Sequence, residues 1–269
     1  MSLRRHAAGV REQGFALLIV LWTMVLLTLL VTGIMGTGRT EAKLASNLEV
    51  NARLRATADG AVYDAIFQEM TKGSAPREIV HGATRILVED EAGKINPNTA
   101  SPELLRSLLR HVGVDDGVAA SLAAAITDWR DDSPTPSPGG AKAPQYIAAG
   151  RHYGPPQEPF QSISELSNVL GMTPAILSRL IPHLSIYNTA APELTVADPV
   201  VAAALRDAAG GQDTGVPAPS ASGSQVFSIT ASVSGPGGAR AVRHADVRIA
   251  TDDHGPGYSI LTWTTPNPE

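Results

Sequence analysis

The sequence predicts an α+β protein that combines one long N-terminal helix, a small antiparallel sheet and a large inserted all-α domain. Three observations support this prediction. An uncharged apolar run lies near the N-terminus, segments of alternating polar and apolar residues occur early and late, and helical patterns fill the stretch between them. Because strand patterns flank the helical ones, we expect one sheet into which a helical domain is inserted.

The apolar run begins at Phe15, and no charged residue follows until Arg39. At about 1.5 Å per residue, a helix over residues 15–35 would be roughly 30 Å long, the thickness of the hydrocarbon core of a bilayer. We therefore expect residues 15–38 to cross a membrane, behind a short leader at residues 1–14. The basic residues of this leader favour a cytoplasmic N-terminus and a body on the other side of the membrane. They are Arg4, Arg5 and Arg11.

Residues 39–73 are expected to continue the same helix beyond the membrane. The stretch 40–70 contains no proline, and apolar residues recur in it at four-residue spacing, which is typical of an amphipathic helix. These apolar positions are Leu44, Leu48, Ala52, Ala58, Val62 and Ile66. Gly73, Ser74 and Pro76 predict the end of the helix.

Two separate segments are expected to supply the sheet. Residues 76–94 predict two short strands around a His81–Gly82 turn. Residues 225–265 predict three more strands, separated by turns at 235–238 and 252–255 that are rich in glycine or aspartate.

Residues 95–187 predict the inserted helical domain. Ser101 and Pro102 suit the N-cap and the first position of its first helix. Helices are expected at 102–109, 118–129, 164–170 and 174–184, with a loop rich in proline and glycine at 131–159. Residues 188–224, which end in a low-complexity stretch, are expected to be a linker.

Composition excludes several classes of function. The 269-residue chain has a formal net charge of −5 and no cysteine, so neither electrostatic binding of nucleic acid nor thiolate chemistry is expected. The seven histidines lack the spacing of metal ligands, and no catalytic constellation stands out. Trp129, Tyr146 and Tyr153 are expected to anchor the core or its loops. We therefore do not expect an enzyme.

A basic leader that ends in Gly14 before Phe15, a long helix and a small sheet together resemble type IV pilin-like proteins. The chain is more narrowly similar to the minor pseudopilin K (general secretion pathway protein K) family of type II secretion systems. The matching stretches are 14–22, 95–105 (INPNTASPELL), 125–132 (AITDWRDD), 148–153 (AAGRHY), 160–173 (FQSISELSNVLGMT) and 180–187. This resemblance implies a pilin-like helix and sheet with an inserted domain of SAM-like or helix-hairpin-helix-like type.

The resemblance also implies a function. Proteins of this kind are cut by a prepilin peptidase, here between Gly14 and Phe15, and can be N-methylated on the new terminus, here Phe15. They lie in the inner membrane with their bulk in the periplasm. The family associates with the I and J minor pseudopilins, with H as a further candidate, and helps to start the pseudopilus at its tip for export of proteins across the outer membrane.

The fifth residue of the mature chain would be Ile19, where most pilin-like proteins carry a glutamate. A carboxylate in the bilayer is costly unless it is paired, and in the family it is thought to pair with the amine of the subunit assembled just before. Absence of this glutamate is a feature of the K family, and it fits a subunit that has nothing above it.

Calcium is the one cofactor that the resemblance raises. It implies acidic ligands around the loop after the Asp-Trp-Arg segment, where this chain has Asp128, Asp131 and Asp132. However, Lys142 replaces a carboxylate of the family pattern, which removes a ligand from an ion that prefers six to eight oxygens and adds a repelling charge. The alternative is that Asp131 and Asp132 are solvated loop residues.

A second class of function stays open, a membrane-anchored periplasmic DNA-uptake receptor. The helix-hairpin-helix modules of such receptors resemble residues 95–101 together with the two short helices that follow, and residues 160–184. Such modules bind phosphates through backbone amides in a tight glycine hairpin. The first hairpin here carries Asp115 and Asp116, and the second loses an amide to Pro174. With only Arg106, Arg110 and Arg179 nearby, no binding of nucleic acid is expected. A pilin-like protein of a competence or type IV pilus system would share only the membrane helix.

Overall fold

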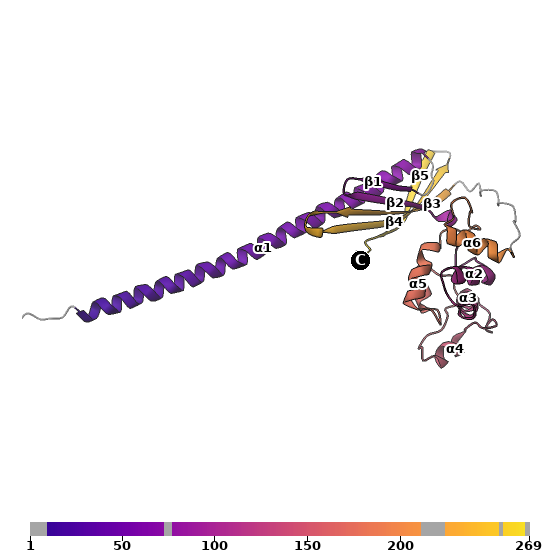
Figure 1. Ribbon diagram of the computed structural model, residues 1–269, viewed down its shortest axis with the longest axis horizontal. Coiled ribbons are helices and arrows are strands. Elements are labelled where there is room, and N and C mark those ends of the chain that lie inside the picture. The colour runs from indigo at the N-terminus through magenta and orange to yellow at the C-terminus, as the bar shows by residue number, and fades with distance from the viewer. Residues whose placement is uncertain (1–9, 73–76, 211–223, 253–254, 267–269) are drawn as a thin grey trace, which may run out of the picture.

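The computed structural model describes residues 10–72, 77–210, 224–252 and 255–266. A long helix packs along a five-stranded sheet, and a compact group of short helices lies beyond the end of that sheet (Figure 1). The predicted α+β class is therefore confirmed, with one antiparallel sheet and a separate helical layer.

Helix α1 (Val10–Lys72) is continuous over 63 residues. In its first half, Phe15–Thr32 is the segment of the described chain that is long and apolar enough to cross a membrane, and none of it is buried against the rest of the protein. The hydroxyls of Thr28 and Thr32 each donate to the carbonyl four residues earlier, at 2.7 Å. These bonds satisfy polar groups that would otherwise face lipid. The helix-ending residues predicted at 73–76 lie outside the described residues.

The sheet has the strand order β1-β2-β3-β4-β5, with every pair antiparallel. The strands are β1 (Arg77–His81), β2 (Thr84–Asp90), β3 (Ser224–Ser234), β4 (Arg240–Asp252) and β5 (Gly255–Thr264). The β2–β3 pair joins residues far apart in sequence, with Thr84 opposite Val233 and Asp90 opposite Phe227. The helical domain is thus inserted between two neighbouring strands.

The second half of α1 covers one face of this sheet. Val62, Ala65 and Ile66 are at most 1% exposed and pack on apolar residues of β2, β3 and β4. Those strand residues are Ile86, Val88, Phe227, Ile229, Ala231, Ala245, Val247 and Ile249. By contrast, Leu44 and Leu48 of the predicted apolar stripe stay about two-thirds exposed (60% and 62%). They lie on the part of the helix that precedes its first buried contacts with the sheet, at Leu54 and Ala58.

The helical domain forms a core of its own. Its elements are η1 (Glu91–Gly93), α2 (Pro102–His111), α3 (Asp116–Arg130), α4 (Ala143–Ala148), η2 (Ile163–Asn168), α5 (Pro174–Leu180), η3 (Ile181–His183) and α6 (Pro199–Ala208); a further turn, η4 (Pro236–Gly238), lies between β3 and β4. As predicted, Ser101 caps α2 by accepting from the amide of Leu104 at 3.2 Å. Leu105, Leu108, Leu122, Ile126 and Leu166 lie at the centre of this core.

Three predictions within this domain need correction. The expected linker 188–224 contains α6, whose Val201 and Ala204 are fully buried in the helical core. The expected loop 131–159 contains α4. The expected helix 174–184 ends at Leu180 and continues as a 3₁₀ turn, because Pro182 has no amide to donate to a longer helix.

Candidate functional site

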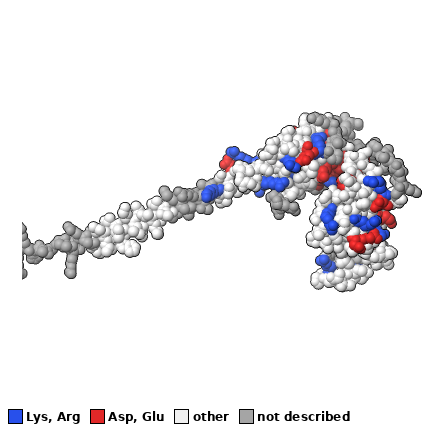
Figure 2. Space-filling model, viewed as in Figure 1, with Lys and Arg blue, Asp and Glu red and all other residues white. Residues whose placement is uncertain are grey.

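The predicted cleavage site lies within α1. Gly14 and Phe15 are both helical, and the side chain of Phe15 is 68% exposed. Ile19, one turn further along, is 47% exposed and presents an aliphatic surface where pilin-like proteins carry a carboxylate. Figure 2 shows no charged side chain along the described first part of α1, whereas both signs of charge cover the sheet and the helical domain. The leader residues 1–9 lie outside the described residues.

The end of α3 carries the most tightly engaged polar group of the helical domain. Asp128 is fully buried, and its carboxylate accepts from the amide of Ser137 (3.1 and 3.2 Å) and from the Ser137 hydroxyl (2.8 Å). Gly140 passes directly over this carboxylate, since a Cβ at that position would lie 2.1 Å from Oδ2 of Asp128. The loop therefore closes on Asp128 only with a glycine at 140.

Lys142, at the end of this loop, is buried and bonds to backbone carbonyls at the end of α3. Its side chain reaches back to α3, where Nζ donates to the carbonyl of Asp128 at 2.7 Å and to the carbonyl of Asp131 at 2.5 Å. The residue is only 2% exposed. Its own amide donates to the side chain of Gln145 at 3.0 Å, which caps the first turn of α4.

The neighbouring residues of α3 anchor the same region to the rest of the domain. Trp129 stacks on Phe160 with ring centroids 5.8 Å apart and planes 6° apart. Arg130 donates to the carbonyls of Pro97 (2.5 Å) and Ala100 (2.6 Å). Tyr146 is fully buried and its hydroxyl accepts from a backbone amide at 2.9 Å, while burial raises the pKa of this phenol to about 12. The predicted anchoring roles of Trp129 and Tyr146 are thus confirmed.

This arrangement does not fit the calcium site that the resemblance raised. The carboxylate of Asp128 is occupied by Ser137, Asp131 is half-buried, and Asp132 is exposed. Across the described ranges, no group of three or more histidine, cysteine, aspartate or glutamate residues could hold a metal ion. The structure therefore leaves the three predicted ligands without a common site, and the two inward-facing carbonyls are taken by Lys142.

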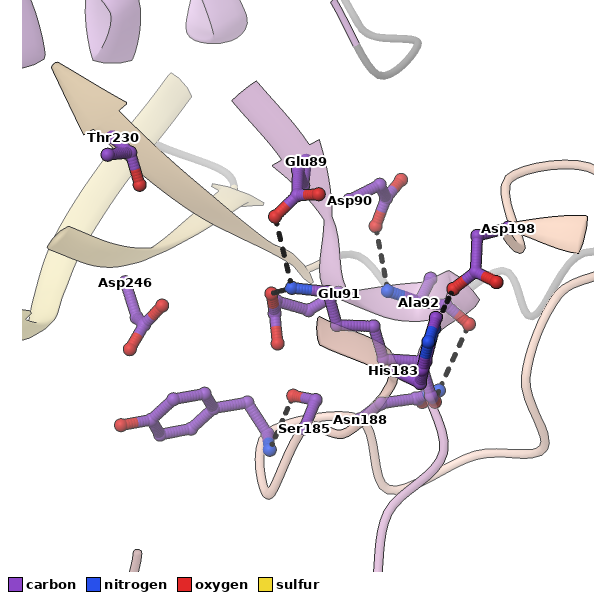
Figure 3. A network of polar contacts seen from close by, with 12 residues as sticks. Glu89, Asp90, Glu91, Ala92, His183, Ser185, Asn188, Asp198, Thr230 and Asp246 are labelled. Atoms are coloured by element: carbon purple, nitrogen blue, oxygen red, sulfur yellow. Dashed lines mark hydrogen bonds and ion pairs between the residues drawn. The ribbon is translucent and has the colours of Figure 1, made fainter. Parts of the chain in front are cut away.

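The junction between the sheet and the helical domain holds a second polar network (Figure 3). Lys94 pairs with Glu91 at 2.7 Å and with Glu89 at 3.3 Å. Burial raises the pKa of Glu91, although Lys94 opposes this shift. On β4, burial acts to raise the pKa of Asp246, but hydrogen bonds from His244 and Thr262 outweigh it, and the pKa is lowered.

Two buried asparagines join the start of the helical domain to the segment between η3 and α6. Asn96 donates to the carbonyl of Asn188 at 2.8 Å, and Asn188 donates to the carbonyls of Ala92 (3.0 Å) and Lys94 (2.9 Å). These bonds place residues 92–96, where the chain enters the helical domain, beside residue 188.

In the first hairpin of the helical domain, groups that could bind a phosphate are engaged within the protein. In the first hairpin, the amide of Gly117 donates to the side chain of Asp115 at 3.0 Å, so an internal carboxylate takes the place of a phosphate. Arg106 pairs with Asp116, and Arg179 donates to the carbonyl of Val112 at 2.7 Å. Both the amide and the arginines are thus engaged within the protein, which argues against the DNA-receptor alternative.

Comparison with known proteins identifies the middle of the chain. Residues 84–189 match the family model described as "Type II secretion system (T2SS), protein K". Residues 84–189, called here the protein K domain after the family that they match, are therefore similar to type II secretion protein K. The predicted resemblance to the protein K family is therefore confirmed for the part of the chain that holds β2, the Asp-Trp-Arg segment and the Lys142 loop.

Two curated relatives agree with this assignment of the protein K domain. The chain is 34% identical over 82 residues to the type II secretion system protein K of Klebsiella pneumoniae, and 32% identical over 82 residues to that of Pectobacterium carotovorum subsp. carotovorum. Each match covers 30% of this chain and 25% of the relative, so the chain matches about a quarter of each relative's length.

The fold of the chain is also similar to a solved structure with which it shares little sequence identity. A chain in the crystal structure of the GspK-GspI-GspJ complex from the enterotoxigenic Escherichia coli type 2 secretion system superimposes with a TM-score of 0.58 at 15% identity. That match covers 86% of this chain and 100% of the other. The helix, sheet and inserted domain therefore belong to one architecture.

Sequence reasoning missed the role of three residues of the protein K domain. Lys142 was expected to repel a metal ion, and Ser137 and Gly140 were not singled out. A Gly139–Gly140 pair just before a lysine at the start of a helix signals a close backbone approach, and this signal could have pointed to the loop.

Proposed function

We propose that this chain is a minor pseudopilin of a type II secretion system. It would span the inner membrane once, with its N-terminus in the cytoplasm and its bulk in the periplasm. The observation that carries the proposal is the two-part character of α1, in which Phe15–Thr32 is exposed and apolar whereas the stretch around Val62 is buried on the sheet. A protein K domain attached to such a helix supports a pilin-like subunit rather than a soluble protein.

Processing by a prepilin peptidase is part of the proposal. The cut would fall between Gly14 and Phe15 and leave Phe15 as an N-methylated terminus. Two features support this position: the basic residues Arg4, Arg5 and Arg11 precede Gly14, and the apolar run begins at Phe15. Removal of the leader would leave the apolar segment at the very start of the mature chain.

A place at the tip of the pseudopilus, where assembly starts, is supported by two further observations. Ile19 offers no carboxylate to pair with the amine of another subunit. The helical domain lies beyond the sheet, at the end of the molecule away from the membrane segment (Figure 1). A bulky domain there would obstruct a subunit stacked above it.

The partners would be the I and J minor pseudopilins, with H as a further candidate, besides the prepilin peptidase. The solved relative was crystallised as a complex of GspK, GspI and GspJ. In this chain, Leu44, Leu48 and Phe67 of α1 are 60–66% exposed, which provides apolar surface for neighbouring helices. The role of the chain would be structural. Burial of helix faces between subunits would drive assembly and export, and no catalytic step is required of the chain.

Secretion in a strain that lacks the endogenous subunit tests this proposal. Gly14→Ala should block processing and abolish export of the substrates of the system, whereas the matched leader variant Gly9→Ala should leave both intact. Normal export with unprocessed Gly14→Ala protein would contradict the proposed function.

A further inference from the structure

The last turn of α3 exposes carbonyl groups that have no partner within the helix. The structure pairs three of the carbonyls near this end. The carbonyl of Thr127 accepts from the amide of Asp131 at 3.1 Å, and that of Trp129 accepts from the amide of Gln157 at 3.1 Å. The carbonyl of Asp128 points to Nζ of Lys142, which also takes the carbonyl of Asp131 just beyond the helix. Lys142 thus supplies the cation at the negative end of the helix dipole.

A buried ammonium group is costly unless hydrogen bonds and charge compensate it. Lys142 is 2% exposed, and its two acceptors are both backbone oxygens, so the ammonium group must donate in both contacts. Asp128, which provides one of those oxygens, also carries a fully buried carboxylate. This carboxylate is oriented by Ser137 from within the loop.

The loop depends on these contacts for its closure. Between Asp131 and Lys142 it contains three prolines and two glycines and has no helix or strand of its own. Three sets of hydrogen bonds hold this loop in place. The amide and hydroxyl of Ser137 donate to the carboxylate of Asp128, and the amide of Gly140 donates to the carbonyl of Ser137 at 2.8 Å. The third set joins Nζ of Lys142 to the carbonyls of Asp128 and Asp131. Removal of the ammonium group would leave two inward-facing carbonyls unpaired.

We infer that the Lys142 ammonium is a built-in cation that organises the loop 131–142 and makes the protein K domain of this chain independent of divalent metal ions. A calcium ion needs six to eight oxygen ligands, and here the two carbonyls are occupied by Nζ while the next residue, Ala143, contributes only a methyl group. A metal ion on the same oxygens would meet the ammonium charge directly. The loop therefore carries its own cation as a side chain.

Hydrogen exchange followed by mass spectrometry, on the full chain in detergent micelles, tests this inference. For the wild type, exchange of peptides that cover 131–142 should be the same in millimolar calcium and in EDTA. Lys142→Met should speed exchange of these peptides by about ten- to a hundred-fold, as expected for the loss of hydrogen bonds to a charged group. Lys43→Met, which changes an exposed lysine of α1, should leave them unchanged.

Two results would overturn the inference. One is slower exchange of the wild-type loop in calcium than in EDTA, which would mean that a metal ion still organises it. The other is wild-type exchange of residues 131–142 in Lys142→Met. If Lys142→Met does not accumulate as folded protein, two measurements on the wild type decide: the comparison of exchange in calcium with exchange in EDTA, and a calorimetric titration. In the titration, calcium should release no binding heat.

Discussion

Replacement of Tyr146 by phenylalanine should weaken the helical domain in two separable ways. At neutral pH it removes the hydroxyl that accepts from the partly buried amide of Leu170 at 2.9 Å. A buried donor left without a partner costs about 1–3 kcal/mol, so for this partly buried amide the free energy of unfolding should fall by about 1 kcal/mol. The ring itself keeps its contacts with Trp129 and Tyr153, at centroid distances of 6.1 and 5.8 Å.

The second effect depends on alkaline pH. Burial raises the pKa of Tyr146 from its usual value of 10.0 to about 12. The folded state therefore keeps this proton to a higher pH than the unfolded state does. The associated stability is present below pH 10 and is lost as the pH rises from 10 to 12. Two pH units at about 1.36 kcal/mol each correspond to about 2.7 kcal/mol, of which about half should be lost by pH 11.

Denaturant unfolding of the full chain in micelles, followed by tryptophan fluorescence at pH 8, 9, 10 and 11, measures both effects. The wild type should lose about 1.4 kcal/mol more than Tyr146→Phe between pH 9 and pH 11. Tyr258→Phe, which removes a hydroxyl from a tyrosine that is 48% exposed, should retain the wild-type slope. Equal slopes for wild type and Tyr146→Phe would refute the reasoning from burial.

Two further substitutions test the packing of the helical domain by the same unfolding measurement. Gly140→Ala should lower the free energy of unfolding by about 1–3 kcal/mol, because its Cβ would lie 2.1 Å from the buried carboxylate of Asp128. The control Gly60→Ala, in α1, should raise it by about 0.5–1 kcal/mol, because a Cβ there would have no atom within 4 Å. Equal effects of the two substitutions would contradict the close approach of Gly140 to Asp128. Asp198→Ala should cost about 1–2 kcal/mol, because Asp198 caps α6 through the amides of Val200 (2.7 Å) and Val201 (3.1 Å). Asp198→Asn should retain most of that stability, and an unchanged stability of Asp198→Ala would contradict the stabilising role of this cap.

Features with a strong local signal could be predicted from the sequence. Uninterrupted apolar and then amphipathic patterning predicted the single helix α1, because helix formation depends on the side chains of each successive turn. Strand patterns on both sides of the helical stretch predicted that β2 and β3 belong to one sheet. The cap at Ser101 follows from a side-chain oxygen that satisfies one of the first free amides of a helix.

Features that depend on tertiary contacts could not be predicted in the same way. Helix α6 lies in a stretch expected as a linker, and it belongs to the core because Val201 and Ala204 pack there. The function of Lys142 depends on two backbone carbonyls, which every residue carries and which no sequence pattern marks. For the same reason, Asp128, Asp131 and Asp132 resembled a set of metal ligands in sequence although the fold gives each a different environment.

Mass spectrometry of the mature N-terminus tests the central claim most directly, that this chain is a pilin-like subunit of a type II secretion system. The chain should be expressed in its host with and without the prepilin peptidase. The proposal predicts a chain that begins at Phe15, with a methylated amine, only when the peptidase is present. An intact leader in both strains would contradict it and would make α1 a permanent membrane anchor.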